Sequence, residues 1–126
     1  MKDIVEKLKQ KEIEMSEQKG PFHLFALFLR EDIQDKWDLL VAAPWISEDK
    51  SEALKYIGSA VQQSLDKNEL MKITRVVMID DTNPALEALQ RAMSIEHGSA
   101  EIMNSNFFGL NIKHAYLITS KRGQKA

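Results

Sequence analysis

Cysteine is absent from the 126-residue sequence, and glycine and proline are scarce, with five and three residues. The lack of cysteine excludes disulfides, thiolate metal sites and cysteine nucleophiles together. The glycines stand apart from one another, so the chain contains no glycine-rich phosphate-binding loop and no G-x-S-x-G motif. The sequence therefore lacks the common signatures of nucleotide binding and of covalent catalysis.

Long apolar runs are missing as well. No segment approaches the ~18 consecutive apolar residues that a membrane-spanning helix needs. Residues 1–18 carry charges at every second or third position and contain no apolar signal segment. We therefore expect a cytoplasmic protein that does not associate with membranes.

No concentration of basic residues is evident along the chain, whose formal net charge is −2. The hydrophobic fraction of 44% and the charged fraction of 29% are ordinary for a globular domain. The arginines are scattered: Arg30, Arg75, Arg91 and Arg122. Because phosphate neutralisation supplies most of the affinity for nucleic acids, we expect no nucleic-acid partner.

Metal-ligand spacings are also lacking. Neither His97 nor His114 has a histidine partner at the i,i+4 spacing of a helical zinc site. The acidic run of Asp32, Asp35 and Asp38 lacks the glycine and the terminal glutamate of a calcium-binding loop. We therefore expect no bound metal and no cofactor.

The hydrophobic pattern predicts three helices and five strands in one domain, residues 1–120, with a frayed tail at residues 121–126. The helices are expected at residues 1–18, at residues 47–65 with Ser47 as N-cap, and from Pro84 to a stop at His97-Gly98. The strands are expected at residues 22–29, 37–43, 73–79, 102–108 and 111–119. In the first helix, Lys11 and Glu12 interrupt the apolar stripe.

The order of these elements, α-β-β-α-β-α-β-β, predicts an α/β fold (α+β is possible) with a mixed sheet of about five strands and three helices. The short connection between residues 22–29 and 37–43 favours an antiparallel hairpin. The helix at residues 47–65 is a crossover that makes strands 37–43 and 73–79 parallel. The ends of these two strands and the start of the first strand are then expected at one edge of the sheet.

Five chemistry-bearing residues are expected at that edge: His23, Trp45, Ser47, Asp80 and Asp81. Open α/β sheets bind ligands outside the carboxyl ends of their strands, so this cluster is the candidate ligand-binding site. Paired aspartates can hold a divalent ion or perturb each other's pKa, and a histidine can transfer protons near neutral pH. An indole ring can line an apolar pocket.

A purely structural interpretation of the same cluster is stronger. Asp81, Thr82 and Asn83 stand where the helix that follows needs caps, and Asp80 suits the positive end of its dipole. A tryptophan is more often a core residue than a ligand contact, and a lone histidine in an apolar strand is usually structural. We therefore assign no catalytic residue.

The function predicted from these observations is a non-enzymatic one, binding another protein or a second copy of the chain. The interrupted stripe of the first helix and a polar segment at residues 104–106 suggest surfaces that one chain does not use, which favours a homodimer. The alternative is a small-molecule-binding domain or a small hydrolase that uses His23, Trp45, Asp80 and Asp81.

Overall fold

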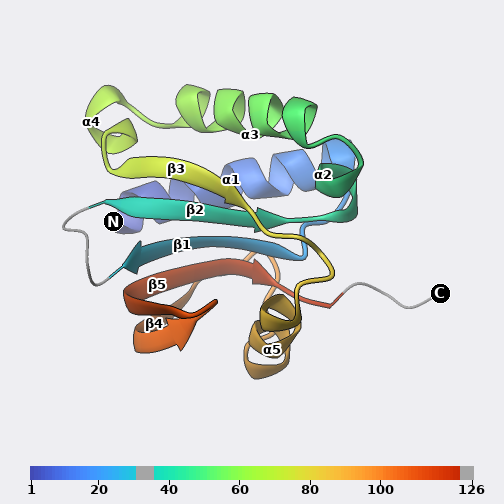
Figure 1. Ribbon diagram of the computed structural model, residues 1–126. Helices are drawn as coiled ribbons and strands as arrows, with labels where there is room; N and C mark the ends of the chain where they lie inside the picture. Colours follow the sequence, from blue (N-terminus) through green and yellow to red (C-terminus); the bar gives the residue numbers. More distant parts are fainter. Residues whose placement is uncertain (31–35, 123–126) are drawn as a thin grey trace.

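A computed structural model describes residues 1–30 and 36–122 of the chain (Figure 1). Five strands form one sheet, and helices pack against both of its faces. In chain order the elements are α1 (Lys2–Lys19), β1 (Leu24–Arg30), β2 (Trp37–Ala42), α2 (Pro44–Glu48), α3 (Lys50–Ser64), α4 (Lys67–Leu70), β3 (Ile73–Met78), α5 (Pro84–Ala92), β4 (Ala100–Phe107) and β5 (Leu110–Ser120). The predicted α/β class and the order of the main elements are confirmed, and α2 and α4 are short additions.

The sheet has the strand order β3-β2-β1-β5-β4. β1 and β2 are antiparallel, with Leu27 opposite Leu39, and β2 and β3 are parallel, with Leu40 opposite Val77. Both predicted pairings are therefore confirmed. β5 pairs antiparallel with both β1 and β4, so the first and last strands of the chain lie side by side at the centre.

The central position of β1 explains why its sequence is apolar at successive positions. Phe25 and Leu27 face α1 and α3, where they pack with Leu8 and Ile57 in the larger core cluster. The intervening side chains of β1 face α5, where Leu86 joins the second cluster. A strand covered on both faces needs apolar residues at every position rather than at alternate ones.

The helix predicted at residues 47–65 is interrupted near its start. Pro44 opens the short helix α2, and Ser47 is an exposed residue inside α2 rather than an N-cap. The chain then extends at Asp49, whose φ is −153° and whose carboxylate accepts a hydrogen bond from the Glu52 backbone N–H. Asp49 is therefore the N-cap of α3, and the prediction for Ser47 was wrong.

The C-terminal hairpin turns where the sequence predicted it. Phe108 and Gly109 have φ values of 55° and 73°, which is the geometry of a two-residue turn with both central residues left-handed. The preceding helix is shorter than predicted, because α5 ends at Ala92 and Ile95 already bridges to Ser120 of β5.

The segment predicted as a tail begins with residues that contact the domain. The Lys121 backbone N–H donates to the His23 carbonyl, and the Arg122 guanidinium bonds the Glu87 carboxylate. Residues 123–126 lie outside the described part of the chain. In the part that is described, none of the helices is long and apolar enough to cross a membrane.

Candidate functional site

The edge predicted to hold a site brings His23 and Asp81 together. His23 precedes β1 and Asp81 follows β3, and the imidazole Nδ1 lies 2.6 Å from the carboxylate Oδ1. The two side chains are 13% and 29% exposed. The backbone holds His23 in place, since its N–H donates to the Ala42 carbonyl and its carbonyl accepts from the Gln90 side chain.

Asp80 does not join this pair. Its Oδ1 accepts hydrogen bonds from the Thr82 backbone N–H at 3.0 Å and from the Thr82 hydroxyl at 2.8 Å. The bond from the backbone N–H is the main reason why the pKa of Asp80 lies below its ordinary value. The N-cap of α5 is Asn83, which accepts from the Ala85 N–H, so Asp81 is a partner of His23 and not a cap.

Trp45 has polar and aromatic partners other than the His23–Asp81 pair. The indole Nε1–H of Trp45 donates to the Gly20 carbonyl at 3.0 Å, and its ring packs at 5.2 Å from the ring of Phe22. Within the part of the chain that the structure describes, neither Trp45 nor Ser47 forms a hydrogen bond or ion pair with His23 or Asp81. Of the five predicted residues, the structure therefore joins His23 and Asp81 by a direct contact.

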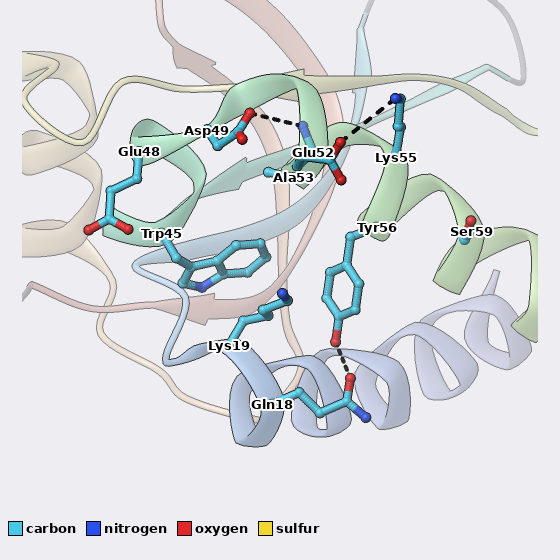
Figure 2. Close-up of a pocket in the computed structure, with 10 residues that line it drawn as sticks. All are labelled: Gln18, Lys19, Trp45, Glu48, Asp49, Glu52, Ala53, Lys55, Tyr56 and Ser59. Atoms are coloured by element: carbon cyan, nitrogen blue, oxygen red, sulfur yellow. Dashed lines mark hydrogen bonds and ion pairs between the residues drawn. The ribbon is translucent and has the colours of Figure 1, made fainter.

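Trp45 instead forms part of an open hollow of about 670 Å³ between the end of α1, α2 and the first half of α3 (Figure 2). Trp45 and Tyr56 supply its aromatic wall, with the two rings nearly perpendicular and their centroids 6.0 Å apart. The other residues around the hollow are mostly charged or polar: Gln18, Lys19, Glu48, Asp49, Glu52, Ala53, Lys55 and Ser59.

A second hollow of about 270 Å³ continues the first one between α1 and α3. Gln18, Tyr56 and Ser59 line both hollows. The Tyr56 hydroxyl donates a hydrogen bond to Gln18 Oε1, which links α3 to α1 where the two hollows meet (Figure 2). We call the combined feature the α1–α3 groove.

Carboxylates outnumber ammonium groups by one among the side chains that line the groove. Glu48, Asp49 and Glu52 line the larger hollow with Lys19 and Lys55, and Glu14 lines the smaller one with Lys11. Burial raises the pKa of the Tyr56 hydroxyl above its ordinary value, and the negative charge of Glu14 adds to this effect. The groove therefore favours positively charged groups over negatively charged ones.

Sequence reasoning identified Trp45 but missed the groove. The sequence contains one local indication of the aromatic wall. Tyr56 directly precedes Ile57 of the apolar stripe of α3, so its ring is expected beside the buried face of the helix. The groove itself arises because α1 packs beside α3, two segments that are distant in the sequence. No local pattern carries that information.

The structure also contains a buried carboxylate that the sequence indicated only as an interruption in the apolar stripe of α1. Glu12 is fully buried and accepts hydrogen bonds from the hydroxyls of Thr119 at 2.8 Å and Ser16 at 3.3 Å. The Nδ1 of His97 lies 2.5 Å from its other oxygen. The contacts of this carboxylate with Thr119 and His97 therefore connect α1 with β5 and with the loop before β4, whereas the Ser16 contact lies within α1.

A metal site is not formed by these groups. Within residues 1–30 and 36–122, no three His, Asp or Glu side chains come together in an arrangement able to hold a metal ion. Of the acidic run considered above, Asp32 and Asp35 lie outside the described residues. Asp38 is a buried residue of β2 and forms two hydrogen bonds of 3.2 Å with the guanidinium of Arg75.

Comparison of the chain with protein-family models, with curated proteins and with solved structures found no match.

Proposed function

We propose that the protein is a non-enzymatic protein-interaction domain that binds a segment of a partner protein in the α1–α3 groove. One observation supports this proposal above the others: the half-buried rings of Trp45 and Tyr56 stand in an open groove whose rim is charged. Protein interfaces typically combine aromatic anchors with a polar rim. We place this interaction in the cytoplasm.

The shape of the groove favours an elongated ligand. The two hollows, of about 670 and 270 Å³, follow one another along α1 and α3 and share three lining residues. Both helices are fixed to the sheet by fully buried side chains, Leu8 from α1 and Ile57 from α3. A binding segment therefore meets preformed walls, which lowers the entropy lost on binding.

The alternative, a small-molecule-binding domain or hydrolase at the strand ends, has weaker support. An acid–imidazole pair is a known arrangement for proton transfer, and His23 and Asp81 form one. However, the His23 side chain is mostly buried, and Asp80 is engaged by Thr82 rather than directed at the pair. We therefore treat His23–Asp81 as a structural contact between β1 and the loop after β3.

A displayed library of random peptides, selected against the immobilised full-length chain, tests the proposal. We expect selected peptides to bind with micromolar dissociation constants when measured by fluorescence anisotropy. The substitution Ser59→Trp places a large ring at the junction of the two hollows and is expected to weaken binding about tenfold or more.

The matched control is Ser51→Trp, which introduces the same side chain at an exposed position of α3 that lines neither hollow. Binding to this variant should equal binding to the unaltered protein. Selected peptides that bind Ser59→Trp as tightly as they bind Ser51→Trp would contradict the proposal, and so would a failure to select any binding peptide.

A further inference from the structure

The aromatic wall of the groove already holds a positive charge. Lys19, the last residue of α1, places its Nζ 5.2 Å from the centroid of the Tyr56 ring. This distance is within the range of a cation–π interaction. The Lys19 side chain is exposed, so solvent and ligands can reach its ammonium group.

The polar atoms of the two rings are already engaged in hydrogen bonds. The Trp45 Nε1–H is engaged by the Gly20 carbonyl, and the Tyr56 hydroxyl is engaged by Gln18. The two rings meet nearly at right angles in an edge-to-face arrangement, and the Lys19 ammonium lies over the electron-rich face of Tyr56. We call Trp45 and Tyr56 the aromatic corner.

The charges around the aromatic corner are unequal. Three carboxylates, Glu48, Asp49 and Glu52, line the larger hollow with two ammonium groups, those of Lys19 and Lys55. The Lys55 ammonium is 3.8 Å from Glu52, and both of these side chains are more than two thirds exposed, so this pair contributes little to stability. The larger hollow therefore carries one more negative charge than positive charges, and this difference favours the binding of a further cation.

We propose that the aromatic corner recognises a lysine side chain of the partner segment, and that Lys19 occupies the corner until that lysine displaces it. This inference rests on the proposed function and names the chemistry that the groove selects. The incoming ammonium replaces the Lys19 ammonium over the Tyr56 ring, while the carboxylates that line the larger hollow supply the opposite charge. Lys19 is therefore an internal competitor that lowers the affinity of the groove for basic segments.

Titration of the full-length protein with tetralysine, observed through the indole N–H resonance of Trp45 by NMR, tests this inference. We expect tetralysine to shift the resonance in a saturable manner and the fully N-acetylated tetrapeptide to leave it unchanged. Lys19→Gln should bind tetralysine about threefold more tightly, since an exposed cation–π contact of this kind is worth about 0.5–1 kcal/mol.

Lys55→Gln is the matched control, because it removes one positive charge from the same hollow without removing a contact to Tyr56. If Lys19→Gln and Lys55→Gln raise the affinity for tetralysine equally, the loss of one positive charge explains the gain, and the inference is overturned. Tyr56→Phe, which keeps the ring, should retain binding, and Tyr56→Leu should lose it. Should either Tyr56 variant not fold, the comparison of the two lysine variants still decides.

The outcome separates this inference from the proposed function. Suppose that the selected peptides bind Ser59→Trp more weakly but contain no lysine that their binding requires. The groove would then remain a docking site, and only the preference for lysine would be overturned. A response to tetra-arginine equal to that for tetralysine would likewise overturn the choice of lysine. Failure of both the selected peptides and tetralysine would overturn the proposed function itself.

Discussion

Each histidine of the chain is held by a carboxylate. The pairs are His23–Asp81, His97–Glu12 and His114–Glu101. The first two join residues that are 58 and 85 positions apart, so each connects elements that meet only in the folded chain. Hydrogen bonds between an ionised carboxylate and an imidazole N–H are stronger than those between neutral groups, which suits them to this role.

Glu12 is the most consequential of these residues because it is fully buried. We expect Glu12→Ala to lower the free energy of unfolding by about 3 kcal/mol, since it leaves the hydroxyls of Thr119 and Ser16 without their acceptor. Glu12→Gln keeps an acceptor oxygen and should cost less than half as much. Urea denaturation followed by circular dichroism measures both values.

The control for this prediction is Glu14→Ala, two positions further along α1, where the side chain is exposed. A loss for Glu12→Ala no larger than that for Glu14→Ala would show that the buried network does not stabilise the fold.

Asp81 offers a second test at the scale of one residue. Asp81→Ala removes the partner of a mostly buried imidazole and is expected to lower the free energy of unfolding by about 1–2 kcal/mol. Asp81→Asn still presents an oxygen to the His23 N–H and should lose less. Thermal melts at neutral pH rank the stability of the unaltered protein, Asp81→Asn and Asp81→Ala. A gain in stability for Asp81→Ala would instead favour a ligand site at this edge, where function opposes stability.

At the scale of elements, the strands were predictable and the helix boundaries were less so. β1 and β3 were identified because apolar and β-branched runs have few other interpretations. The start of α3 was misplaced because Ser47 and Asp49 are both good caps, and only the extended backbone at Asp49 decides between them. The aromatic corner was not predictable, since it depends on which helices become neighbours.

The short helix α4 depends on the charge of one carboxylate. Glu69 closes a capping box with Asp66 and also bonds the Lys7 ammonium of α1 at 2.7 Å. The bond from Lys7, followed by the Asp66 backbone N–H, lowers the pKa of Glu69 below the ordinary value of 4.5. A carboxyl group with a lowered folded-state pKa stabilises the fold above its unfolded value and loses that contribution as the pH falls through the folded value.

We therefore expect the unfolding free energy of the unaltered protein to decrease as the pH is lowered from neutral to about pH 3, and Glu69→Gln to make that decrease smaller. Urea denaturation at both pH values measures the difference. Glu17→Gln, a change at an exposed position of α1, should leave the pH dependence as it is. An unchanged pH dependence in Glu69→Gln would contradict the assigned role.

At the scale of the whole molecule, the two edges of the sheet differ. β4 has an irregular backbone at Asn104, whose φ is 50°, and such irregularities hinder pairing with another strand. β3 is regular from Arg75 onward and carries the half-buried apolar residues Val76, Val77 and Met78. The more regular edge is that of β3, and we propose that two copies extend the sheet there across a two-fold axis.

We expect light scattering at micromolar concentration to give twice the mass of one chain. Thr74→Lys places a charge at an exposed position of β3 and should yield a monomer with unchanged circular dichroism. Met103→Lys, an equivalent change at an exposed position of β4, should leave the dimer intact. A monomer for the unaltered protein would exclude self-association through β3.

The pairing of β1 with β5 has a consequence for how the chain folds. The first strand reaches its second neighbour only when the last strand is in place, and the Glu12–Thr119 contact spans 107 positions. Local helices and the β1–β2 hairpin can form early. The pairing of β1 with β5 forms later, because it joins segments from opposite ends of the chain. During synthesis, β1 therefore emerges with one open edge, and nascent chains that stall before β5 are the species most exposed to aggregation.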